Sequence, residues 1–250
     1  MKNKFLLMVL IALCTLLQGC FGIEEKILIH KDGSGTYTFS MDLTEALKEM
    51  TEMVQKLDKA FKNDSDTATG KTPQDLQNET YKKLKEDSRL TDLQTLNSIK
   101  GISNSREFVD TANGLFITGI SFDFTDVNAL NKGLVAMLSP GDGKNKKQGN
   151  IPPATYGYKN GVLTRELSKA TTDNMFKDMK LDAKTEAMFK KMFKDFKYTI
   201  TVQSDAEIKK VTAPGGVISQ KGKKTSIEYN LLEESKEVIK ARMRSEVQVY

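Results

Sequence analysis

The sequence contains only one His and two Cys, and no Trp, among its 250 residues. Most zinc sites, and catalysis by Ser-His-Asp or Cys-His groups, need residues that this chain barely contains. The cysteine count also excludes a framework of several disulfides. With 5 Pro and 17 Gly, the composition is neither collagen-like nor of low complexity. We therefore expect a protein without a metal centre or cofactor, and with few catalytic options.

The residues that are present favour a globular chain. Hydrophobic residues make up 38% of the sequence, enough to bury a core, and charged residues make up 28%. The net charge of +5 is too small for a disordered polyelectrolyte. Loss of Lys2 and Lys4 with a leader would leave 36 basic against 33 acidic residues, a net charge of +3. This mild positive bias does not indicate a nucleic-acid partner.

The first residues have the organisation of a secretory signal. Lys2 and Lys4 precede an almost unbroken apolar run over residues 5–17. About 13 apolar residues fit the hydrophobic region of a signal peptide and are fewer than the roughly 18 that span a bilayer as a helix. The pattern predicts a signal peptide over residues 1–19 and not a transmembrane anchor.

The run ends in Leu17-Gln18-Gly19-Cys20, which resembles the bacterial lipobox. The resemblance implies that Cys20 becomes the first residue of the mature chain, with a diacylglycerol on its thiol and often a fatty acid such as palmitate on its amino group. Two or three acyl chains anchor a protein stably to a bilayer. The alternative is an ordinary secreted protein with a free thiol, which is a liability in an oxidising compartment. Cys14 leaves with the leader, so the mature chain has no disulfide.

The residues after Cys20 bear on location. Phe21 is not the aspartate that retains lipoproteins in the inner membrane of enteric bacteria, which favours the outer membrane if the cell is Gram-negative. Glu24 and Glu25 resemble acidic signals for surface display in some Gram-negative groups. Whether the protein faces the periplasm or the cell surface is left open.

Three β-hairpins are expected, because Asp-Gly and Asn-Gly pairs supply the positive φ angles that tight turns need. Their strands and turns are residues 27–29 and 37–39 around Asp32-Gly33, Phe108 and residues 115–120 around Asn113-Gly114, and residues 156–158 and 162–163 around Asn160-Gly161. Further strands are expected at 197–202, 206–211, 226–231 and 241–249. These last four predict a C-terminal β-meander.

Apolar residues at three- and four-residue steps predict amphipathic helices at 43–61 and 127–138, with a short helix at 75–86. The fold class is therefore α+β, with antiparallel hairpins and a C-terminal β-meander covered by amphipathic helices. Residues 20–23 are expected to form a lipidated tether and residues 24–250 a single domain. A polar loop at 139–154 leaves open a division into two lobes.

A six-residue pattern occurs twice where a strand passes into a helix. Ser40-Met41-Asp42-Leu43-Thr44-Glu45 is matched by Ser121-Phe122-Asp123-Phe124-Thr125-Asp126. Either a hairpin-helix unit has been duplicated, or strand ends and helix caps independently favour these residues. In both cases Asp42 and Asp123 belong to caps, and we do not assign them to a catalytic pair.

Residues 173–196 predict a helix with an apolar stripe surrounded by lysines. The stripe can pack on the sheet as core, and the strands' need for a cover favours this alternative. It can also lie on an anionic membrane or hold a hydrophobic partner. The residues of this candidate hydrophobic binding face are Met175, Phe176, Met179, Met188, Phe189, Met192 and Phe193.

The body resembles the mycobacterial LppM-type lipoprotein domain over residues 24–40 and 198–231. The shared pattern is an Asp-containing turn between two short strands and, later, Pro214-Gly215, Gly222 with basic neighbours, and a strand with a central aromatic residue. Tyr229 stands where Trp is usual, and the C-terminal transmembrane segment of many members has no counterpart. The resemblance implies an α+β lipoprotein domain with no established catalytic residues.

These observations predict a lipid-anchored, non-enzymatic binding or structural module of the bacterial cell envelope. Its expected partners are the bilayer, through acylated Cys20, and an unidentified envelope protein or lipid, but not nucleic acid. Two alternatives remain: a carrier of lipid or hydrophobic clients between membranes, and a glycan hydrolase that uses two carboxylates. The absence of Trp disfavours the hydrolase, because glycan clefts are usually lined with aromatic residues.

Overall fold

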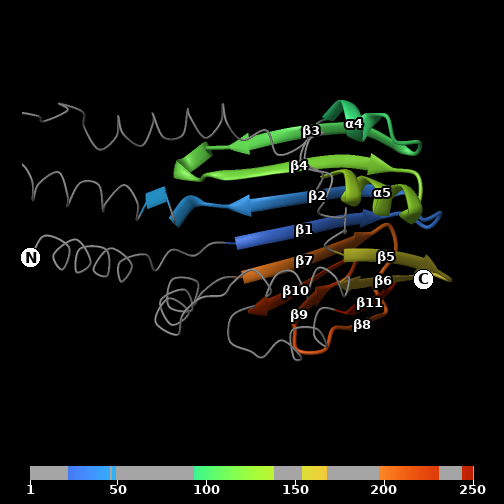
Figure 1. Ribbon diagram of the computed structural model, residues 1–250. Helices are drawn as coiled ribbons and strands as arrows, with labels where there is room; N and C mark the ends of the chain where they lie inside the picture. Colours follow the sequence, from blue (N-terminus) through green and yellow to red (C-terminus); the bar gives the residue numbers. More distant parts are fainter. Residues whose placement is uncertain are drawn as a thin grey trace, which may run out of the picture.

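A computed structural model describes residues 22–45, 47–48, 93–137, 154–167, 197–230 and 244–249. The elements, in chain order, are β1 (Gly22–Ile29), β2 (Gly35–Asp42), α4 (Leu93–Asn97), β3 (Ile102–Asp110), the 3-10 turn η1 (Ala112–Gly114), β4 (Ile117–Phe124), α5 (Val127–Met137), β5 (Ala154–Lys159), β6 (Val162–Leu167), β7 (Lys197–Ser204), β8 (Lys210–Thr212), β9 (Val217–Lys221), β10 (Lys224–Asn230) and β11 (Ser245–Gln248) (Figure 1). The helix that starts after β2 is described at residues 44–45 and 47–48.

The described strands form two sheets. One sheet has seven strands in the order β3-β4-β2-β1-β7-β10-β9, and the other has four in the order β5-β6-β11-β8. Neighbouring strands are antiparallel except for β1 and β7, which run parallel. The predicted α+β class, with antiparallel hairpins, is confirmed.

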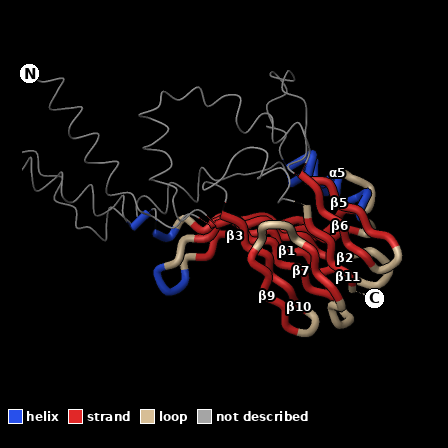
Figure 2. The backbone as a smooth tube through the Cα atoms, turned by 90° about the horizontal axis from the view of Figure 1, so that it is seen from below, coloured by secondary structure: helices blue, strands red, loops and turns tan. Residues whose placement is uncertain are grey.

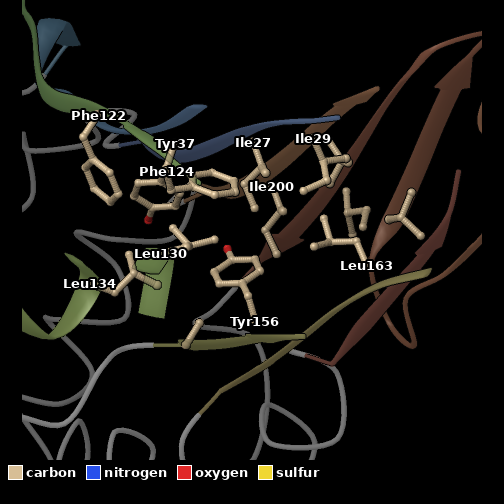
Figure 3. Packing of buried hydrophobic residues seen from close by; sticks show 14 of the residues in the cluster. Ile27, Ile29, Tyr37, Phe122, Phe124, Leu130, Leu134, Tyr156, Leu163 and Ile200 are labelled. Atoms are coloured by element: carbon tan, nitrogen blue, oxygen red, sulfur yellow. The ribbon is translucent and has the colours of Figure 1, made fainter. Parts of the chain in front are cut away.

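The core lies between the two sheets, and α5 lies beside β5 at one end of the smaller sheet (Figure 2). Side chains alternate along each strand, so one face of each sheet supplies the buried residues. Figure 3 shows this packing, with Ile27, Tyr37 and Ile200 of the larger sheet facing Tyr156 and Leu163 of the smaller one. Leu130 and Leu134 extend the core from α5, and both are 1% exposed or less.

All three predicted hairpins are present, and their glycines adopt the expected backbone angles. Gly33 has a φ of 87° in the β1–β2 turn, and Asn160 and Gly161 have φ angles of 53° and 75° in the β5–β6 turn. Positive φ at both central residues is the type I′ turn that suits the twist of a hairpin. The β3–β4 connection is longer and contains η1, whose Gly114 has a φ of 76°.

The C-terminal strands are shared between the two sheets. β7, β10 and β9 stay in the larger sheet, whereas β8 pairs with β11 in the smaller one. Between β7 and β8 the chain passes from one sheet to the other, because the N–H of Ile208 donates to Gly222 and the N–H of Lys209 donates to Gln248. β8 is consequently only three residues long and begins at Lys210, later than the predicted start at residue 206.

The repeated six-residue pattern begins on two adjacent antiparallel strands, β2 and β4. The shift that carries Ser40 onto Ser121 also carries Phe39 onto Ile120, and these two are direct Cα partners on β2 and β4. The same shift carries β1 onto residues 103–110, which lie within β3. The positions of the two hairpins therefore favour a repeated hairpin-helix unit over independent convergence at strand ends.

Only one of the two aspartates in the repeated pattern caps a helix. Asp42 accepts a hydrogen bond of 2.9 Å from the N–H of Thr44, where the helix after β2 begins. At the second junction the cap is Asp126, which accepts from the N–H groups of Asn128 and Ala129 at the start of α5. Asp123 instead joins strands and is described below.

The described part of the chain confirms one predicted helix, since α5 covers residues 127–137 of the expected 127–138. Most of the predicted helix at 43–61, and all of those at 75–86 and 173–196, lie outside the described residues. No helix within the described ranges has the length and apolar character needed to cross a membrane.

Candidate functional site

The site residues predicted from the sequence lie outside the described residues. This applies to Cys20, to the signal peptide, and to the whole candidate hydrophobic face, Met175, Phe176, Met179, Met188, Phe189, Met192 and Phe193. Lipidation and the Met/Phe face therefore stay predictions. The structure does describe the strand that follows Cys20 and a buried polar cluster that the sequence analysis did not identify.

The first described residue already belongs to the sheet. β1 begins at Gly22, two positions after Cys20, inside the span that was expected to be a tether. Gly22 pairs with Asp42 of β2 on one side and with Lys197 of β7 on the other. Because β1 has a neighbour on both sides along its whole length, Cys20 is joined to an interior strand of the seven-stranded sheet by Phe21 alone.

Asp42 and Asp123 do not form a pair. Asp42 is opposite Ile117, at the end of β2 where β1 begins, whereas Asp123 is opposite Thr36 near the other end of the same ladder. Asp123 accepts hydrogen bonds from Asn104 at 2.7 Å and from Thr36 at 2.6 Å. These two bonds lower the pKa of Asp123 from its ordinary value. Through these two hydrogen bonds, Asp123 on β4 links β3 and β2.

The buried polar cluster consists of Glu25 on β1, Arg165 on β6, Tyr156 on β5 and Tyr198 on β7. Nε of Arg165 lies 2.8 Å from Oε2 of Glu25, and Nη2 lies 3.0 Å from Oε1, so the guanidinium and the carboxylate form a bidentate ion pair. Each tyrosine hydroxyl donates to one carboxylate oxygen, Tyr156 to Oε2 and Tyr198 to Oε1. The same hydroxyls accept from Arg165, at 3.1 Å and 2.9 Å.

The strand registers bring these four side chains together. Glu25 occupies the core-facing series of β1, with Ile27 and Ile29 after it, so its carboxylate points between the sheets. Tyr156 is the direct cross-strand partner of Arg165 in the smaller sheet. The ring of Tyr198 lies 5.4 Å from the guanidinium carbon, within the range of a cation–π contact.

The cluster is almost fully removed from water, with Glu25 0% and Arg165 2% exposed. Burial alone would raise the pKa of Glu25, but the charge of Arg165 and the hydrogen bonds from Arg165, Tyr156 and Tyr198 outweigh it. The net effect is a pKa below the ordinary value of 4.5. Burial and the nearby charge of Glu25 raise the pKa of Tyr156 well above 10. The cluster is therefore a charged pair solvated by two neutral phenols.

Two more tyrosines are buried near this cluster. Tyr37 packs edge-on against Tyr156, with ring centroids 6.4 Å apart. The hydroxyl of Tyr229 on β10 is buried and has no hydrogen-bond partner among the residues that the structure describes. Burial raises the pKa of Tyr229 to about 12. Tyr229 thus occupies core space without joining the polar network.

The geometry supports a structural role for the cluster. It joins two strands of one sheet to two strands of the other, and the two charges are paired with each other and hydrogen-bonded to both tyrosines. A glycoside hydrolase needs one carboxylic acid that holds a proton near neutral pH. Glu25, the buried carboxylate of the described residues, has its pKa shifted in the opposite direction. Within the described ranges, no group of three or more His, Cys, Asp or Glu side chains is arranged to hold a metal ion.

The cluster was not predicted, although the sequence contains a signal for it. Glu25 lies in the period-two series Ile23, Glu25, Ile27, Ile29, whose three remaining members are all apolar. Arg165 similarly lies between Leu163 and Leu167 in its own strand. A charge in a core-facing series predicts burial, and opposite charges in two such series predict a pair. Glu25 was instead interpreted, together with Glu24, as an acidic signal for surface display. The structure shows that Glu25 is buried and paired with Arg165.

Comparison with known proteins adds little to this description. No protein-family model matches the chain, and no curated protein matches it at a significant level. Among solved structures, the chain is similar to the folded domain of LppM from Mycobacterium tuberculosis, determined by NMR. The alignment covers 93% of this chain and 92% of that chain, with 11% sequence identity and a TM-score of 0.39. This is the lipoprotein family that the sequence resembles, but a likeness of this size carries no argument about function.

Proposed function

We propose that the protein is a lipoprotein of the bacterial cell envelope, held on a bilayer through acylated Cys20, that acts as a non-enzymatic binding or structural module. The observation that carries the proposal is the start of β1 at Gly22, paired on both sides. An anchor attached to an interior strand, with Phe21 as the connection, holds the domain directly at the membrane surface. The lipobox supplies the chemistry of the anchor, and an outer-membrane location belongs to the same proposal.

The buried cluster supports the role of a rigid module. Glu25 and Arg165 lock the two sheets together, so the surface presented to a partner keeps its shape. A buried pair of this kind is often no more stabilising than an apolar pair. Its proposed role is therefore to specify one arrangement of the two sheets.

A second candidate function, a carrier of lipid or hydrophobic clients, is favoured by one feature of the chain. The Met/Phe stretch at 173–196 is followed directly by Lys197, the first residue of β7. Lys197 is the Cα partner of Gly22. The stretch is therefore joined directly to the end of β7 that pairs with the start of β1, where the proposed anchor is attached. We propose that Met188, Phe189, Met192 and Phe193 contact the bilayer or a hydrophobic client there.

The anchor is tested by expressing the full-length precursor in bacteria with Cys20→Ser and, as a matched control, Cys14→Ser. Serine cannot form the thioether, so the Cys20 variant is expected to lack the added mass of the diacylglycerol. The Cys14 variant, altered within the leader, is expected to mature and fractionate like the wild type. A wild-type protein whose mass spectrum shows a bare thiol at position 20 would contradict the proposal.

The carrier function is tested separately on the purified wild-type lipoprotein and a Phe189→Asp/Phe193→Asp variant. Mass spectrometry of extracted material is expected to find stoichiometric lipid with the wild type and less with the variant. Equal lipid content in both, or none in either, would exclude the carrier and leave the anchored module.

A further inference from the structure

The two sheets have four outer strands among the described residues, and three of them are protected against pairing with another chain. Exposed edges of a sheet offer unpaired N–H and C=O groups, and native proteins usually block them with bulges, covering elements, very short strands or charged side chains, especially Lys. β3 has a bulge between Ser103 and Arg106, with Asn104 at a φ of 53°. α4 packs beside β3, and β8 is only three residues long.

The third protected edge is β5, whose outward backbone groups at Tyr156 are hydrogen-bonded by a side chain of α5. On β5, the N–H of Tyr156 donates to the side chain of Asn131 on α5, and the amide of Asn131 donates back to the C=O of Tyr156, both at 2.8 Å. The side chain of Asn131 thus takes the place of a neighbouring strand. α5 packs beside this edge (Figure 2).

Among the described residues, β9 has no bulge and no covering element, and its one charged residue is Lys221 at the end of the strand. It is five residues long, pairs with β10 without a bulge, and every residue in it is exposed. Val217 is 73% and Ile218 42% exposed, the two large hydrophobic residues of the described ranges that are most open to water. It is the outermost strand on its side of the larger sheet (Figure 1). β9 is thus an exposed, partly apolar edge.

The hairpin geometry fixes which backbone groups of β9 point outward. Lys221 and Lys224 flank a two-residue turn, in which Gly222 has a φ of 55°. In such a hairpin the flanking residues exchange both of their hydrogen bonds, and the pattern then alternates along the strands. Ile218 and Gln220 therefore direct their N–H and C=O groups away from β10. The same alternation places the backbone groups of Tyr156 on the outer side of β5, where Asn131 meets them.

A concentration of positive charge flanks this edge. Lys209, Lys210, Lys221, Lys223 and Lys224 are all exposed, and none of the five forms an ion pair within the described part of the chain. The hydrogen bond from Ile208 to Gly222 brings the first two beside the turn that carries the other three. Lys221 and Lys224 are direct cross-strand partners, and like charges in that position destabilise a hairpin.

We propose that β9 is a docking edge for an extended acidic segment of a partner protein, which adds an eighth strand to the larger sheet. The outward groups of Ile218 and Gln220 would form the ladder, Val217 and Ile218 would contact apolar side chains of the segment, and the lysines would pair with its carboxylates. Charge complementarity selects this occupant. The inference rests on the proposed binding role and names the surface and the chemistry of the partner.

Binding is tested with the full chain and labelled heptapeptides, followed by fluorescence anisotropy. The probes alternate Glu with Val or Lys with Val, and a third is the Glu peptide with N-methyl groups on alternate residues. The Glu peptide is expected to bind, more weakly at high salt, and the other two to bind at least about tenfold more weakly, since one has the wrong charge and one lacks the ladder donors.

The protein variants are Ile218→Pro, which removes an outward N–H, and Ile218→Thr, which keeps it. Proline is tolerated on an edge strand where the N–H faces solvent, so the hairpin bonds to β10 remain. Ile218→Pro is expected to weaken binding of the Glu peptide about tenfold or more, and Ile218→Thr by less.

Several outcomes would overturn the docking edge. Equal binding of the Glu and N-methylated peptides, equal binding by wild type and Ile218→Pro, or no binding of any probe would each do so. A wild-type dimer in sedimentation that Ile218→Pro converts to a monomer would assign the edge to a second copy instead. None of these results depends on Cys20, so failure here is distinguishable from failure of the anchor.

Discussion

Glu25 on β1 and Arg165 on β6 are 140 residues apart in the chain and form a two-pronged ion pair that connects the two sheets. The pair is buried, and two tyrosine hydroxyls complete its hydrogen bonding. Removing two charges from water makes such a pair costly to form. Removing only one partner is more costly still, because it leaves the other charge buried without compensation. Three of the predictions below concern this cluster.

The first prediction concerns the loss of one charge. Glu25→Leu leaves Arg165 as an uncompensated buried cation, and Arg165→Met leaves Glu25 as a buried anion. Each single variant is expected to lower the free energy of unfolding by about 3–5 kcal/mol. The double variant Glu25→Leu/Arg165→Met is expected to lose less than either single variant. Urea denaturation of the four proteins measures the full cycle, and additive losses would show that the two charges do not act as a pair.

The second prediction is a dependence of stability on acid. Because the pKa of Glu25 is lower in the folded protein than its ordinary value of 4.5, the stabilisation is complete above that value and is lost as the pH falls through the folded pKa. The free energy of unfolding is expected to decline below about pH 4.5 in the wild type. Glu25→Gln should flatten this decline, whereas Glu207→Gln, at an exposed position, should leave it unchanged. Parallel pH profiles of Glu25→Gln and wild type would contradict the assignment.

The third prediction compares two buried tyrosines. The hydroxyl of Tyr198 donates to Glu25, whereas that of Tyr229 has no partner among the described residues. Tyr198→Phe is expected to cost about 1.5–3 kcal/mol, since it removes a hydrogen bond to a charged group. Tyr229→Phe removes an unpaired buried hydroxyl and is expected to leave stability unchanged or raise it by about 1 kcal/mol. Thermal and urea unfolding of both variants checks the order, and a larger loss for Tyr229→Phe would refute it.

The fourth prediction concerns two glycines in the β1–β2 ladder. A Cβ on Gly35 would lie 1.9 Å from the carbonyl oxygen of Leu28, so the backbone would have to move. Gly35→Ala is expected to cost on the order of 3 kcal/mol. Gly22→Ala is the matched control, because its nearest contact would be Asp42 Cβ at 3.8 Å. Circular dichroism during thermal unfolding should separate the two variants, and equal midpoints would contradict the clash.

The turns and strands were largely predictable because their causes are local. Asn160-Gly161 adopts the two positive φ angles that make a hairpin, and nothing distant in the chain is needed to explain them. α5 could be placed for the same reason, although the sequence did not distinguish Asp123 from Asp126 as its cap. Asp126 directly precedes α5, whereas Asp123 lies within β4, where it accepts a hydrogen bond from Asn104 of β3.

The arrangement of the strands into sheets was not predictable in the same way. The parallel pairing of Gly22 with Lys197 and the departure of β8 to the smaller sheet depend on contacts between distant segments. The site shows the same limit, since Glu25 was identified only as an acidic residue near Cys20. Its burial is indicated by the core-facing period-two series of β1, but its partners on β5, β6 and β7 lie on distant segments that no local pattern connects to it.

The interior position of β1 has a consequence for how the molecule is made. The ribosome produces this strand first, yet its parallel neighbour β7 and its ionic partner Arg165 are synthesised last among the elements it needs. Long-range closure of this kind is slow, because the chain loses much entropy before the contacts form. The β1–β2 hairpin therefore cannot complete its core contacts until the last third of the polypeptide has been made, and its core-facing side chains stay exposed to water until then.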